Sequence, residues 1–127
     1  MRLFLVRHAE AAPGDPDDLR PLTTGGRDTA RELAARLAAE QPEAVLTSPL
    51  LRARETAAAI ADAAGLAAEA DERLAPGATA DDLRGAAAGH GDTVVAVGHE
   101  PDCSEIVLAL TGREVRFAPG AFVEVAL

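Results

Sequence analysis

A cationic side chain and an imidazole, Arg7 and His8, follow directly on the apolar run at residues 3–6. A continuous apolar run of this length is typical of a strand buried on both faces of a sheet. In open α/β sheets, ligands bind just beyond the carboxyl ends of such strands. By itself the dipeptide also fits an exposed pair at the start of a loop, so its role depends on what the rest of the chain brings near it.

Two later segments also run from an apolar strand into residues that suit an anion. The segment 44–47 leads into TSPLLRARET, which places Arg52 in the first turn of a helix, and the segment 92–98 leads directly into His99. Neighbouring carboxyl ends of parallel strands share one crevice, so we expect all four side chains to lie together. Backbone N–H groups of the first helical turn would also favour an anion there.

Two arginines and two imidazoles in one crevice suit the transfer of a phosphoryl group. Guanidinium groups bind its oxygens in a fork geometry, while one histidine can attack phosphorus and the other can stabilise charge on the oxygens. Around these residues, Thr47 and Ser48 are expected to shape a turn, and Arg54 and Glu55 to be solvated helix charges.

Other phosphate chemistries lack their sequence patterns. The chain has no GxxxxGK[ST] for a P-loop, and its Cys103 is followed by an apolar helical segment without the arginine of a cysteine phosphatase. The sequence DPDD lies in a proline-rich loop and not after a strand, and HAE is not followed by the CxxC of a zinc deaminase.

The composition bears on partners and location. A chain of 127 residues has the length of one domain, which we expect to span residues 1–127. The net charge of −9 argues against nucleic acid or an anionic membrane as a partner, because both need basic patches. A single cysteine excludes an intramolecular disulfide, and no segment resembles a signal peptide or a membrane span. We therefore expect a cytoplasmic protein that acts as a monomer.

The spacing of the apolar residues predicts alternating strands and helices. Beyond the first strand, helices are expected at 27–40, 50–65, 80–89 and 101–112, and strands at 44–47, within 67–79, at 92–99 and in the tail at 114–127. Thr23 or Thr24 is the expected N-cap of the first helix, and Gly65 the C-cap of the second. This alternation predicts an α/β fold, a single three-layer domain with a mainly parallel central sheet and helices on both faces.

Four motifs together resemble the histidine phosphatase superfamily. They are LFLVRHAEA, RPLTTGG, VLTSPLLRARET and VVAVGHEPD, and they occur in the family's order across nearly the whole chain. The short chain is most similar to phosphohistidine phosphatases of the SixA type. The resemblance implies that His8 is the nucleophile carrying a transient phosphoryl group, and that Arg7, Arg52 and His99 bind and polarise the phosphate. It also implies that Arg20, within LRPLTT, lines the pocket.

The acidic residues depart from the pattern of many relatives. Phosphoglycerate mutases and related enzymes carry a general-acid carboxylate beside a glycine turn, whereas the corresponding stretch here, DERLAPGAT, has Arg73 at that step. Asp71 and Glu72 lie nearby but out of step, and Glu100 follows His99. The sequence leaves open whether one of these three carboxylates acts as general acid. The long insertions that enclose sugar phosphates in relatives are missing as well.

The sequence therefore predicts a phosphatase with a phosphohistidine intermediate, acting on protein phosphohistidine, with no cofactor and no metal. Its three histidines show no metal-ligand spacing. Two alternatives stay open: a small-molecule phosphomonoesterase of the same superfamily, and a phosphate-binding module without turnover. The complete set of arginines and histidines favours an enzyme, because a binding module needs cations but no placed nucleophile.

Overall fold

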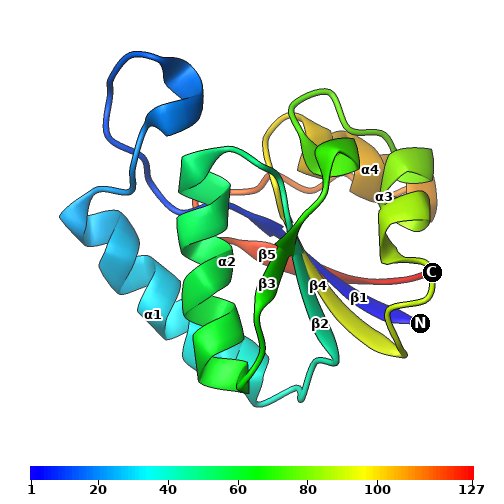
Figure 1. The fold of residues 1–127 in the computed structure, drawn as a ribbon. Helices are drawn as coiled ribbons and strands as arrows, with labels where there is room; N and C mark the ends of the chain where they lie inside the picture. The colour runs from blue at the N-terminus through cyan, green and yellow to red at the C-terminus, as the bar shows by residue number, and fades with distance from the viewer.

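The computed structural model describes residues 1–127, which form one five-stranded sheet (Figure 1). The strands are β1 (Arg2–Arg7), β2 (Ala44–Thr47), β3 (Ala68–Ala70), β4 (Thr93–Gly98) and β5 (Phe122–Ala126). They lie in the order β3-β2-β4-β1-β5, and every neighbouring pair is parallel except β1 with β5. The predicted α/β fold with a mainly parallel sheet is confirmed.

Helices cover both faces of this sheet. They are α1 (Thr24–Ala38), α2 (Leu51–Ala64), α3 (Ala80–Ala87) and α4 (Asp102–Thr111), with the short 3₁₀ turns η1 (Asp17–Leu19) and η2 (Glu72–Leu74). Figure 1 shows α1 and α2 on one side of the strands and α3 and α4 on the other, and a separate apolar cluster joins each pair to the sheet. The three layers are those that the sequence predicts.

The apolar run of β1 serves both of these clusters, which explains why it does not alternate with polar residues. Leu3 and Leu5 belong to the cluster beneath α3 and α4, whereas Phe4 and Val6 belong to the cluster beneath α1 and α2. Full burial of each such side chain stabilises a fold by roughly 1.5–3 kcal/mol. The strand is therefore a firm support for the residues that follow its carboxyl end.

The predicted boundaries hold to within two residues, apart from the start of the first helix and the tail. Helix α1 begins three residues earlier than the periodicity indicates, at Thr24, because the Thr23 side chain caps it by accepting a hydrogen bond from the Gly26 backbone N–H. The tail forms a single strand, β5, and the Gly120 N–H before it bonds to the carbonyls of residues 7 and 8. Gly65 ends α2 in the left-handed conformation, as expected.

Parallel pairing brings the carboxyl ends of β1, β4 and β2 to one edge of the sheet. In Figure 1 the loop that carries η1 stands at the same end of the molecule as the start of α2. This edge therefore collects side chains from four distant parts of the chain.

None of the helices combines the length and the apolar character needed to cross a bilayer.

Candidate active site

His8 lies immediately beyond the carboxyl end of β1, and a hydrogen bond to the next residue fixes its ring. Its Nδ1 is 2.7 Å from the carbonyl oxygen of Ala9. Because a carbonyl only accepts hydrogen bonds, Nδ1 carries the proton and the lone pair lies on Nε2. The Ala9 N–H donates in turn to the Thr56 hydroxyl on α2, at 3.0 Å. Burial and the charge of Arg52 lower the pKa of His8, so its imidazole is neutral and nucleophilic at neutral pH.

His99 follows β4, the parallel neighbour of β1, and therefore meets His8 at the same edge. The register pairs Arg7 with Gly98, and the two imidazole centroids lie 5.2 Å apart. His99 is buried, and its Nε2 lies 2.7 Å from the Ser48 hydroxyl oxygen beyond β2. Burial, and then the neighbouring His8, lower the pKa of His99 to about 4. Both rings are therefore neutral.

The Ser48 hydroxyl orients His99. Its oxygen accepts a hydrogen bond from the Leu50 backbone N–H at 3.2 Å, which leaves its own proton free for Nε2 of His99. In that tautomer Nδ1 of His99 carries the ring proton. The two site histidines then present different atoms to the site: His8 its Nε2 lone pair, and His99 its Nδ1.

Arg52 lies in the first turn of α2 and is only 7% exposed. Its guanidinium donates to the Asp17 carbonyl at 2.8 Å and to the Asp17 carboxylate at 3.2 Å. Arg20 donates to the same carboxylate at 2.9 Å and to the Ala12 carbonyl at 2.8 Å. The turn η1 thus joins Arg20 to Arg52 at the rim of the site.

Arg7 completes the set, and one of its donors has no partner in the protein. One terminal nitrogen donates to the Phe117 carbonyl at 2.8 Å. Only two buried side-chain nitrogen or oxygen atoms in the chain have no hydrogen-bond partner, Nε of Arg7 and Nδ1 of His99. Buried donors are almost always partnered, and a phosphoryl oxygen would accept from both. The structure therefore brings Arg7, His8, Arg52 and His99 together, with Arg20 at their edge.

None of the carboxylates that the sequence left open bonds to a site histidine. Asp71 forms an ion pair with Arg73 at 2.8 Å, and the hydrogen bond from that arginine lowers the pKa of the carboxyl. Glu100 accepts a backbone N–H of α4 at 2.8 Å, and Glu72 is exposed in η2. Asp17 is instead the carboxylate that contacts the site arginines.

Two sequence-based interpretations need correction. Ser48 does more than shape a turn, because its hydroxyl contacts His99. Glu55 is not simply solvated, because its carboxylate accepts the Leu22 backbone N–H at 2.8 Å and so ties the η1 loop to α2. Ser48 could have been found, since it follows β2 as His8 follows β1. Asp17 carries no such signal in its proline-rich loop.

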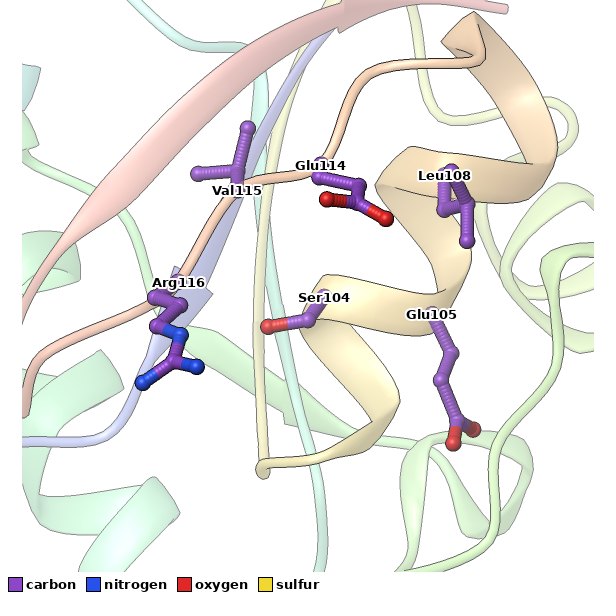
Figure 2. Close-up of a pocket in the computed structure, with 6 residues that line it drawn as sticks. All are labelled: Ser104, Glu105, Leu108, Glu114, Val115 and Arg116. Carbon is purple, nitrogen blue, oxygen red and sulfur yellow. The ribbon is translucent and has the colours of Figure 1, made fainter.

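The largest pocket of the surface lies apart from these site residues. It measures about 430 Å³, lies between α4 and the segment after it, and is lined by Ser104, Glu105, Leu108, Glu114, Val115 and Arg116 (Figure 2). Neither a histidine nor a cysteine lines it, so it offers no counterpart to the histidine pair. No group of three or more histidine, cysteine, aspartate and glutamate side chains is placed to hold a metal ion.

A three-layer fold with an Arg-His pair at the carboxyl end of β1, and a second histidine beside it, defines a class of phosphoryl-transfer protein. The chain belongs to the histidine phosphatase superfamily, since the model of that superfamily's branch 1 matches residues 3–76. This match contains four of the five candidate residues, whereas His99 lies beyond it.

SixA is among the similar proteins in sequence and in structure. Phosphohistidine phosphatase SixA of Escherichia coli is 39% identical over 74 residues, which cover 56% of this chain and 46% of the relative. A solved structure of SixA with tungstate aligns with a TM-score of 0.87 and 31% identity, over 100% of this chain and 88% of that one. An uncharacterised protein of Picosynechococcus is 39% identical over 97% of this chain and 83% of its own.

A more distant likeness supports the fold alone. The structure of a mycobacterial glucosyl-3-phosphoglycerate phosphatase aligns with a TM-score of 0.76, over 97% of this chain and 88% of that one, at 20% identity. The architecture is thus shared with a phosphatase of a small molecule, and the choice of substrate must be argued from the site.

Proposed function

We propose that this chain is a phosphohistidine phosphatase that removes the phosphoryl group from histidine on a protein, with His8 as the acceptor. The observation that carries the proposal is a neutral His8, with its lone pair on Nε2, beside two buried nitrogen atoms without a hydrogen-bond partner, Nε of Arg7 and Nδ1 of His99. The similarity to SixA supports the phosphohistidine substrate.

In the first step, His8 takes the phosphoryl group. Its Nε2 lone pair forms the new N–P bond while the bond from phosphorus to the substrate's imidazole nitrogen breaks. That nitrogen keeps the electron pair, and a neutral imidazole leaves when the other ring nitrogen is protonated. Arg7, Arg52 and the Nδ1–H of His99 stabilise the charge on the phosphoryl oxygens.

In the second step, water regenerates the enzyme. A water oxygen attacks phosphorus, the N–P bond breaks, and the electron pair returns to Nε2 of His8. Inorganic phosphate leaves, and the protons of the water are shared between phosphate and solvent. The hydrogen bond from Nδ1 of His8 to the Ala9 carbonyl holds the ring in one orientation through both steps.

The acidic residues favour an imidazole leaving group over an alkoxide. An alkoxide needs a proton in the transition state, and a placed general acid supplies roughly 10²–10⁴ in rate. No carboxylate hydrogen-bonds to either site histidine, and Asp71 is engaged by an arginine. A P–N bond to a protonated imidazole is cleaved without such an acid.

Comparing leaving groups tests this proposal. We expect kcat/KM to rank a phosphohistidine-bearing protein and p-nitrophenyl phosphate well above glycerol phosphate. Comparable turnover of glycerol phosphate would favour a small-molecule phosphomonoesterase, and in that case Asp71→Asn or Glu72→Gln should slow the alkyl substrate selectively. Phosphate binding without turnover of any substrate would favour a non-catalytic module.

The expected setting of the enzyme belongs to the same proposal. A cytoplasmic location suits its single, buried and free Cys103. We expect it to act as a monomer on a phosphorylated partner protein, without a cofactor or metal. Light scattering of the purified protein tests whether it is a monomer. The rate after treatment with a chelator tests whether it needs a metal.

A further inference from the structure

The site contains its own anion. The Asp17 carboxylate accepts a hydrogen bond from Arg20 at 2.9 Å and from Arg52 at 3.2 Å. These hydrogen bonds, the one from Arg20 first, lower the pKa of Asp17, so the carboxylate is charged at neutral pH. A carboxylate bound to two guanidinium groups resembles a bound phosphoryl group in charge and in its hydrogen-bonding pattern.

The two contacts of Asp17 with Arg52 have different functions. The Asp17 main-chain carbonyl accepts from one terminal nitrogen of Arg52 at 2.8 Å, and this contact does not depend on the side chain. The carboxylate engages the other terminal nitrogen. Removing the carboxylate's charge would therefore leave Arg52 oriented and release part of its positive charge to another anion.

Burial shows which partner can give way. Arg52 has little room to move, because its side chain is 9% exposed, whereas the Asp17 side chain is 66% exposed. An incoming phosphoryl group can displace the carboxylate into solvent, and the carboxylate can return to the arginines when phosphate leaves. Such an exchange replaces one anion by another without exposing a buried cation.

We propose that the Asp17 carboxylate is an internal competitor for the phosphoryl oxygens and sets how tightly the site holds inorganic phosphate. The carboxylate lowers the affinity of the site for inorganic phosphate and so prevents Arg20 and Arg52 from retaining this product. This inference rests on the phosphoryl-binding part of the proposed function, but not on the choice between protein and small-molecule substrates.

Calorimetric titration of the resting protein with inorganic phosphate at neutral pH tests the inference. Asp17→Asn keeps the size and a hydrogen-bonding oxygen but removes the charge, and Asp18→Asn removes the same charge from the neighbouring residue, which contacts no arginine. Because the substitution removes the anion that competes for these guanidinium groups, we expect Asp17→Asn to lower the Kd for phosphate about 5-fold. Asp18→Asn should leave it within about 2-fold of the wild type.

Each other outcome overturns the inference in a distinct way. Weaker binding by Asp17→Asn would make the carboxylate a positioning group for Arg52, and an unchanged Kd would make it a surface ion pair without function. Equal tightening in both variants would reflect net charge alone. A wild-type protein that binds no phosphate would instead contradict the proposed function. Thermal melting verifies folding, and Asp17→Ser replaces the first variant if that variant is unfolded.

Discussion

The imidazole rings of His8 and His99 lie with their centroids 5.2 Å apart and their planes inclined by 59°. The parallel pairing of β1 with β4, which sets Arg7 opposite Gly98, imposes this proximity. Two charged rings at this distance would repel each other, and the site keeps both neutral by burial. Both rings then carry their proton on Nδ1, but they present different atoms to the site: the Ala9 carbonyl occupies Nδ1 of His8 and leaves Nε2 open, whereas the Ser48 hydroxyl occupies Nε2 of His99 and leaves Nδ1 open.

The lowered pKa values of the two histidines predict how stability depends on pH. The pKa of His99 falls from 6.5 in the unfolded chain to about 4 in the folded protein. Below pH 6.5 the unfolded chain therefore takes up protons that the folded protein does not. We expect the free energy of unfolding to decrease as the pH falls from 6.5 towards 4, and His99→Asn to weaken this dependence. Ring NMR titration that gave both histidines ordinary or raised pKa values would contradict the account.

Arg52 should act on the transition state, whereas its neighbour Arg54 should not. Removing one preorganised charge-stabilising donor costs about 10²–10³ in rate, or roughly 3–4 kcal/mol. We expect Arg52→Ala to show a loss of that size in kcat/KM with p-nitrophenyl phosphate. Arg54→Ala, which changes an exposed side chain of the same helix, is the matched control. A loss below about threefold for Arg52→Ala, against the expected range, would make Arg52 an ordinary helix residue.

The fold could be predicted largely because its signals are local. The run at residues 3–6 is apolar since its alternate side chains enter two different cores, and the helices around 51–64 and 102–111 end at glycines that adopt the left-handed conformation. The apolar spacing alone indicates the start of α1 three residues late, because Gly25 and Gly26 interrupt it. The predicted N-cap at Thr23 is confirmed and marks that start correctly.

The sequence predicts those residues of the candidate site that come directly after a strand. His8 and His99 occupy such positions, and Arg52 follows a third strand end in the first turn of α2. The contacts of Asp17 depend instead on how the η1 loop folds back over α2, which no periodicity encodes. The carbonyl of Phe117 that holds Arg7 is likewise a backbone group, and any residue type could supply it.

Ser48 should affect catalysis through His99. Ser48→Ala removes the hydroxyl that lies 2.7 Å from Nε2 of His99 and frees that ring to change tautomer. The loss of one hydrogen bond of about 1–1.5 kcal/mol corresponds to roughly a tenfold lower kcat. Ser48→Thr keeps the hydroxyl and should restore most of the rate, and the pKa of His99 measured by NMR should shift only in the alanine variant.

A control serine separates this effect from a general loss of hydroxyl groups. Ser104 on α4 bonds to Glu100 and does not contact His99. We expect Ser104→Ala to keep the wild-type kcat. An equal loss of rate in both alanine variants, or no loss in Ser48→Ala, would remove Ser48 from the account.

Chelation should leave the rate unchanged. The mechanism stabilises the phosphoryl oxygens with arginine and histidine N–H groups, and no cluster of metal-ligating side chains is available. We expect the same kcat/KM before and after dialysis against EDTA. Inactivation by EDTA that a divalent metal reverses would show that a metal ion, and not the arginines alone, stabilises the transition state.

Trapping the phosphoenzyme tests the central claim most directly. The protein is mixed briefly with a ³²P-labelled phosphohistidine substrate, quenched in alkali, digested and analysed by mass spectrometry. We expect a phosphoryl group on His8 that is stable in alkali, is lost in acid and is absent from His8→Ala. A label that persists in His8→Ala, or that maps to His99 in the wild type, would contradict it.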